Sequence, residues 1–176
     1  MHLSGRFDQL KNVLYSGKFL DPAFFVPSMD YYKTSRDAVP TVSGNTIVMR
    51  CSDSANDWSY VQSMLSLQID LSQYSTLTFN IDAINVTSNG LFTVRYSSTK
   101  YTGNQMSMPH SGMPLLYSIA KNDPQYTGQV TIDLSNVNIT GYLYFCINTG
   151  YAGNMNSWSD GYNGTINCTI SNLRIS

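Results

Sequence analysis

The chain has 176 residues, enough for one domain with a sizeable core and too few for two comfortable ones. Only 12% of the residues are charged, all eleven acidic residues are Asp, and a composition without Glu argues against long helices. The net charge of −1 argues against nucleic-acid binding through a basic face, and no apolar run is long enough for membrane insertion.

The N-terminal region allows two interpretations. Residues 1–8 lack the apolar core of a signal peptide, so we expect a mature domain without its leader or a protein kept in a cytoplasm until release. Residues 1–11 are expected to form a lead or attachment segment with apolar residues at roughly helical spacing, followed by a strand near residues 12–20. Asp21-Pro22 and Val26-Pro27 are then expected to break the chain, because a residue before proline disfavours helix.

Apolar and polar residues alternate with a period of two in much of the remaining chain, which indicates strands with one face in a core. The clearest alternation covers residues 46–51, 77–82, 92–96, 130–134 and 143–147. Segments 58–71 and 114–120 are expected to be further strands. In the last segment the apolar residues shift phase, which predicts a β-bulge near Ser171-Asn172.

A four-residue phrase occurs twice, as Ile69-Asp70-Leu71-Ser72 and as Ile132-Asp133-Leu134-Ser135. Each copy leads, after a short polar turn, into a strand-like run that starts at Thr76 or at Gly141. A strand that ends, turns and re-enters as a half-buried strand is the unit of an antiparallel β-sandwich. We therefore predict an all-β antiparallel sandwich, a jelly roll of about eight strands, over residues 12–176.

Thiol and metal chemistry receive little support from the sequence. Cys51, Cys146 and Cys168 cannot all pair and fit no zinc motif, so we expect buried free thiols. Asp53 and Asp57 lie in a polar run that offers the hard oxygen ligands of calcium, but Asx-turns explain the same residues and no EF-hand pattern is complete. We expect no cofactor.

Catalytic patterns are also missing from the sequence. His110, in the long loop from Ser97 to Met113, has no acid within several residues, and we expect it to be solvated. No nucleophile elbow, phosphate loop or zinc-protease motif occurs. A glycosidase would need two carboxyl groups at a defined separation, whereas turns and outward strand positions explain each Asp. We predict that the protein is not an enzyme.

Aromatic residues in loops are the better signal for a binding site. The loop from Gly150 to Gly164 combines aromatic rings with polar side chains, and a second Trp follows the Asp53–Asp57 run. Rings of this kind can stack on sugars, although each Trp could instead plug an end of the sandwich. The candidate ligand-binding residues are Trp158, Tyr162, Tyr151, Asp160, Asn154 and Trp58.

Several short motifs resemble those of carbohydrate-binding-module-like jelly rolls. They are the opening Asn12–Phe19, Trp58–Gln62 followed by Leu77–Phe79, the two Ile-Asp-Leu-Ser phrases, and the closing Ile170–Ile175. Such domains also occur in the tail, baseplate and fibre proteins of bacteriophages. The resemblance implies a sandwich that displays loops without catalysis, and it transfers no binding residue.

From the resemblance and the composition we predict a non-catalytic bacteriophage virion protein for host-surface attachment or virion decoration. It would contact other copies of itself, as a trimer in fibres, together with other virion proteins and a host glycan. One alternative is a carbohydrate-binding module of a secreted polysaccharide-degrading enzyme, which would be extracellular. Another is a capsid or tail decoration protein without a ligand.

Overall fold

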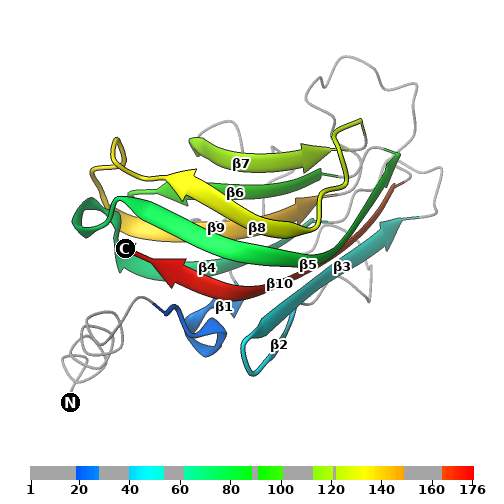
Figure 1. Cartoon of the computed structure of the whole chain (residues 1–176), viewed down its shortest axis with the longest axis horizontal. Coiled ribbons are helices and arrows are strands. Elements are labelled where there is room, and N and C mark those ends of the chain that lie inside the picture. Colours follow the sequence, from blue (N-terminus) through cyan, green and yellow to red (C-terminus); the bar gives the residue numbers. More distant parts are fainter. Residues whose placement is uncertain are drawn as a thin grey trace.

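The computed structural model describes residues 19–27, 40–53, 62–88, 91–100, 113–120, 122–148 and 164–176. Within these residues two antiparallel sheets of five strands face each other (Figure 1). One, called here the β9 sheet, has the order β1 (Val26–Pro27), β4 (Gln62–Asp70), β9 (Thr140–Asn148), β6 (Leu91–Ser97), β7 (Leu115–Ala120). The other, the β10 sheet, has the order β2 (Thr41–Ser43), β3 (Thr46–Asp53), β10 (Gly164–Ile175), β5 (Thr76–Ser88), β8 (Gly128–Asp133).

The strand order confirms the predicted jelly roll. From β3 to β10 each strand lies in the opposite sheet to the one before it, except that β6 and β7 are neighbours in one sheet. The short strands β1 and β2 extend the two sheets at their edges. The only helices in the described part of the chain are the 3-10 turns η1 (Pro22–Phe24) and η2 (Leu71–Gln73), and neither is long or apolar enough to cross a membrane.

The expected chain break at Val26-Pro27 is wrong, because these two residues form β1 and pair with Ser66 and Leu65 of β4. Proline is tolerated there because β1 is an edge strand, and an edge strand has no neighbour on its open side that would need the missing N–H. Of the predicted strand 58–71, residues 62–70 form β4, residues 58–61 lie outside the described residues, and Leu71 belongs to η2.

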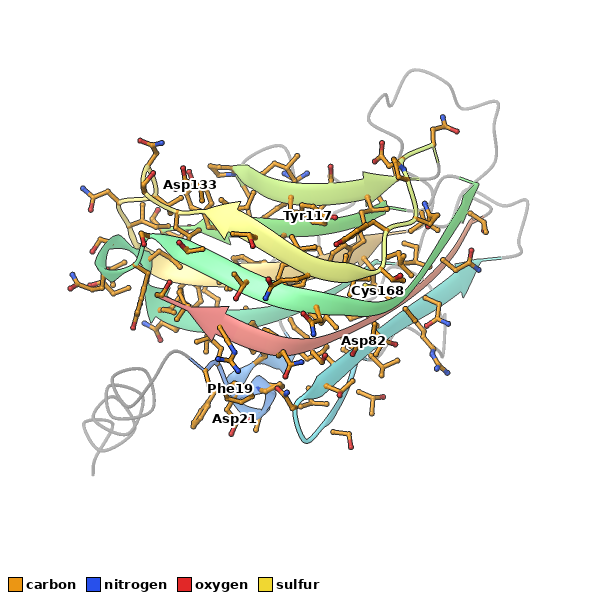
Figure 2. The ribbon with its side chains drawn as sticks, in the orientation of Figure 1. Phe19, Asp21, Asp82, Tyr117, Asp133 and Cys168 are labelled. Carbon is orange, nitrogen blue, oxygen red and sulfur yellow. The ribbon has the colours of Figure 1, made fainter. Side chains whose placement is uncertain are left out.

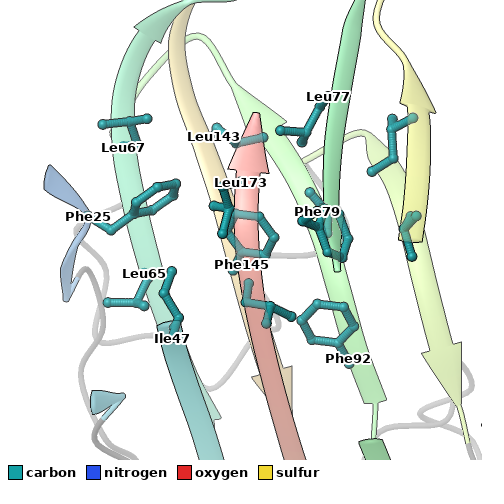
Figure 3. Packing of buried hydrophobic residues seen from close by; sticks show 14 of the residues in the cluster. Phe25, Ile47, Leu65, Leu67, Leu77, Phe79, Phe92, Leu143, Phe145 and Leu173 are labelled. Atoms are coloured by element: carbon teal, nitrogen blue, oxygen red, sulfur yellow. The ribbon is translucent and has the colours of Figure 1, made fainter. Parts of the chain in front are cut away.

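A hydrophobic core fills the space between the sheets (Figure 3). Phe145 of β9 is fully buried at its centre, with ring centroids 5.5 Å from Phe25, 5.5 Å from Phe79 and 6.4 Å from Phe92. Phe79 belongs to the β10 sheet, so these rings join the two layers. Full burial of one such side chain contributes about 1.5–3 kcal/mol.

The predicted bulge in β10 is confirmed. The pairing between β10 and β5 shifts between Ser171 and Arg174, and Asn172 adopts a positive φ of 52°. The shift restores burial of the last apolar residues, because Leu173 and Ile175 lie in the core. Asn45, in the hairpin turn between β2 and β3, donates its side-chain N–H to the Asn172 Oδ1 at 2.7 Å.

The repeated phrase forms the same cap twice at one end of the sandwich. The Asp70 and Asp133 carboxylates accept the backbone N–H groups of Ser72 and Ser135 at 3.2 and 2.8 Å (Figure 2 shows Asp133 at the end of β8). Hydrogen bonds from the following serines lower the pKa of both carboxyl groups. The Ile and Leu of each copy are buried, so the phrase turns the chain from one sheet to the other while it fills the core.

Candidate functional site

Every aromatic candidate from the sequence lies outside the described residues, and so do Asp57 and His110. Asp53 is the last residue of β3. The polar candidates Asn154 and Asp160 also fall outside the described part of the chain. The structure therefore tests neither the predicted sugar contacts nor the candidate calcium ligands, and both stay predictions.

The strand ends that border the two Trp-bearing segments lie together. Asp53, before the first segment, pairs with Gly164, which follows the second. Gln62, after the first segment, pairs with Asn148, which precedes the second. Segment 54–61 links β3 to β4, and segment 149–163 links β9 to β10. Because β3 neighbours β10 and β4 neighbours β9, both segments begin and end at the same end of the jelly roll.

The two long loops singled out in the sequence begin at opposite ends of the sandwich. Ser97, where β6 ends, pairs with Tyr142 near the start of β9, whereas Leu91, where β6 begins, pairs with Asn148 at the end of β9. The connection after Ser97 thus leaves from the end opposite to the Trp-bearing segments.

The outer face of the β9 sheet carries a polar and aromatic row that the sequence interpretation missed. Gln68 of β4, Tyr142 of β9 and Ser97 of β6 are register partners and alternate with core residues, so they share this face. Gln68 is exposed, and Tyr142 and Ser97 are partly exposed. The next pair towards the strand ends is Asp70 with Thr140, also accessible. We call Gln68, Tyr142 and Ser97 the open row.

The adjacent row on the same face is covered. Ser66 and Tyr144 are 1% and 0% exposed, although they point away from the core between the sheets. Met113 and Cys146 pack against Tyr144 in a second hydrophobic cluster, with Tyr142 at its border. The Tyr144 hydroxyl donates to the Thr99 carbonyl at 3.4 Å.

Arg95 organises the covered region. Its Nη1 donates to the Met113 carbonyl at 2.8 Å and its Nε donates to the Thr93 Oγ1 at 3.3 Å. Burial lowers the pKa of the Arg95 guanidinium from its ordinary value, yet the group stays charged because that value is far above neutral pH. Burial also raises the pKa of the nearby Cys146 thiol to about 12, so this thiol is neutral.

The signal for a covered outer face was present in the sequence. Tyr144 and Cys146 alternate with Leu143, Phe145 and Ile147, so β9 is apolar on both faces. A strand that is apolar on both faces is buried on both faces. That pattern indicates that something packs on the outside of β9, although it does not identify Met113 and Thr99.

The outer face of the β10 sheet is different. The outward side chains of its described strands are mostly Thr and Asn, and none of them is aromatic. Phe19, which is 36% exposed, forms a bridge with Arg174 of β10 at the border of this face. Arg50 of β3 donates its Nε to the Asn167 Oδ1 of β10 at 3.2 Å across this exposed surface. Phe19 lies outside the strands of this sheet, whereas Tyr142 lies within the β9 sheet between polar register partners, so the β9 sheet carries the better candidate site.

Four of the described carboxylates act as caps. Asp21 accepts the Ala23 N–H at 2.8 Å, and Asp123 accepts the Ala120 N–H at 2.8 Å, as Asp70 and Asp133 do at their turns. A general acid needs a raised pKa, whereas the resolved shifts of Asp70 and Asp133 go down. No cluster of three metal-ligating His, Cys or Asp side chains occurs among the residues the structure describes.

No family model and no curated protein matches the chain. Its fold is similar to that of solved carbohydrate-binding modules. A family 29 carbohydrate-binding module from Piromyces equi has 7% identity and a TM-score of 0.41, covering 90% of this chain and 85% of that one. TmCBM61 in complex with beta-1,4-galactotriose has 10% identity and a TM-score of 0.38, with 92% and 91% covered.

The similarity extends to a catalytic protein. The xyloglucanase domain of NopAA from Sinorhizobium fredii, in complex with cellobiose, has 13% identity and a TM-score of 0.38, with 93% and 98% covered. At these identities the likeness concerns the fold alone.

Proposed function

We propose that this protein is a non-catalytic carbohydrate-binding β-sandwich. The observation that carries the proposal is the open row, in which the partly exposed Tyr142 ring lies between the Gln68 amide and the Ser97 hydroxyl. A sugar presents apolar C–H faces that pack on an aromatic ring and hydroxyl groups that bond to amides and hydroxyls. The row carries no charge, which suits a neutral glycan.

The Trp-bearing end is a second proposed contact region. Trp158, Tyr162 and Trp58 combine large rings with the polar Asn154 and Asp160 in the sequence. The convergence of the flanking strand ends supports their joint action, since Asp53 pairs with Gly164 and Gln62 with Asn148. This region and the open row lie at opposite ends of β9, so separate substitutions can test them.

The non-catalytic part of the proposal rests on the carboxylates. In the described residues, Asp21, Asp70, Asp123 and Asp133 are each engaged in a turn or strand-end cap. Glycoside hydrolysis requires two carboxyl groups on opposite sides of the scissile bond, and none of these four forms such a pair at the open row. Asp70 lies nearest to the row, and its bonds to Ser72 keep it ionised.

The experiment is a glycan array probed with the full chain, followed by titration calorimetry on any ligand found. Tyr142→Ala and Trp158→Ala test the two regions, and Tyr126→Ala is the matched control because Tyr126 is 50% exposed and belongs to neither region. Loss of binding on Tyr142→Ala with an unchanged control supports the open row. A wild-type array without any bound glycan refutes the proposed function.

As the biological setting we propose the virion, with host-surface attachment as the role and no cofactor. A composition rich in Ser, Thr, Asn and Tyr and the buried free thiols Cys146 and Cys168 support assembly in a reducing cytoplasm. Light scattering on the full chain tests the expected homo-oligomer. A sugar-binding monomer would favour the secreted module instead, and a trimer without sugar binding would favour a decoration protein.

A further inference from the structure

The outer face of the β9 sheet is divided between an accessible and a covered part. The open row of Gln68, Tyr142 and Ser97 is exposed to different degrees, whereas Tyr144, two residues further along β9, is fully buried. A fully open face would follow β9 for its nine residues, about 30 Å at the usual rise per residue. The open row spans only the distance from β4 to β6, about 10 Å at the usual spacing of neighbouring strands.

Both borders of the β6–β7 connection contact the covered part. On one side the Tyr144 hydroxyl donates to the Thr99 carbonyl. On the other side Met113 is 5% exposed and packs on Tyr144 and Cys146. The Met113 carbonyl accepts from Arg95, whose planar guanidinium bonds to Thr93 at the same time. Arg95 therefore holds Met113 against the outer face of the β9 sheet.

We propose that Arg95 is a positioning residue that determines ligand length. By holding Met113 on Tyr144 and Cys146, it ends the glycan platform at Tyr142, so the platform takes a short oligosaccharide segment that crosses β4, β9 and β6. A long chain that follows the strands is excluded. This inference rests on the proposed function and adds to it the size and direction of the ligand.

Ser66 of β4 is the register partner of Tyr144 and is buried in the same row. Its Oγ has no hydrogen-bond partner. Such a hydroxyl would regain partners if water or a ligand reached it. Arg95 and the packing of Met113 oppose an opening over Tyr144, so removal of the Arg95 bonds is expected to uncover Tyr144.

The test measures affinity against ligand length by calorimetry, with oligosaccharides from disaccharide to hexasaccharide of the glycan found on the array. For the wild type we expect the affinity to rise until the row is spanned and then to stay constant. Arg95→Met should let the affinity rise further with length, by roughly tenfold for one added hydrogen-bonded contact. Arg95→Lys should restore the plateau in part, because an ammonium can still reach the Met113 carbonyl.

Arg50→Met is the matched control, because Arg50 makes a comparable bond to Asn167 on the opposite outer face. It should leave the length profile unchanged. Tyr144→Phe releases the bond to Thr99 and gives a second, milder variant if Arg95→Met does not fold. A wild-type affinity that keeps rising with length, or a folded Arg95→Met with the wild-type plateau, overturns the inference.

The two proposals fail in different ways. An array without bound glycan refutes the proposed function and this inference together. Binding that is lost on Trp158→Ala and unaffected by Tyr142→Ala refutes the inference alone, because the glycan would then use the Trp-bearing end.

Discussion

Replacement of Phe145 by Ala tests the packing of the two sheets most directly. The side chain is fully buried and its ring contacts Phe25, Phe79 and Phe92 at centroid distances of 5.5 to 6.4 Å. Truncation of a buried Phe to Ala lowers the free energy of unfolding by about 3–5 kcal/mol. Since a domain of this kind has a total stability of about 5–15 kcal/mol, the variant should be close to unfolding.

Urea unfolding followed by circular dichroism measures the effect, with two companion variants. Phe145→Leu keeps most of the buried volume and loses the ring contacts, so we expect a loss of about 1–3 kcal/mol. Phe24→Ala is the control, because Phe24 is 36% exposed, and we expect a loss below about 1 kcal/mol. If Phe145→Ala were as mild as Phe24→Ala, Phe145 would not lie between two facing sheets, and the sandwich described above would be wrong.

Four further predictions follow from particular contacts. Folding lowers the pKa values of Asp70 and Asp133 below the ordinary value of 3.8, so both carboxylates stabilise the fold above that pH. Stability should therefore fall as the pH drops through the lower folded-state pKa. The double variant Asp70→Asn with Asp133→Asn should flatten that fall in acid unfolding curves. Gly141→Ala should cost about 1–3 kcal/mol in thermal unfolding, because the new Cβ would meet the Ser97 carbonyl oxygen and lie 2.9 Å from the Ser98 Cα. Cys146 and Cys168, whose pKa values burial raises to about 12, should react with a thiol reagent only after unfolding, and rapid native labelling would contradict their burial. Calcium and a chelator should leave the unfolding temperature unchanged, whereas a clear increase with calcium would favour Asp53 and Asp57 as ligands.

The body of the sandwich could be predicted because each main strand has one face in a shared core. Ile47, Phe79 and Phe145 all fall at alternating positions, and burial of a single face leaves that period in the sequence. The bulge at Ser171-Asn172 was predictable for the same reason, since a shift of phase is visible wherever both flanks are buried. The short edge strands were missed, because two or three residues such as Val26-Pro27 carry no period.

The candidate site was harder to predict because it depends on contacts between distant parts of the chain. Tyr144 is covered by Thr99, which lies 45 residues away in the sequence, and by Met113. No local pattern shows that Tyr142 stays accessible while Tyr144 does not. The Trp-bearing end remains a prediction, supported by the convergence of its flanking strands.

The central position of β10 has a consequence for how the protein is made. β10 (Gly164–Ile175) lies between β3 and β5 and pairs with both along most of its length. On the ribosome, neither neighbour can complete its ladder until these late residues have emerged from the exit tunnel. A nascent chain therefore presents two open sheet edges during translation, and such edges invite pairing with other chains. Slow decoding of the β10 codons, or their loss through a premature stop, would lower the solubility of the protein before it changed any surface that binds a ligand.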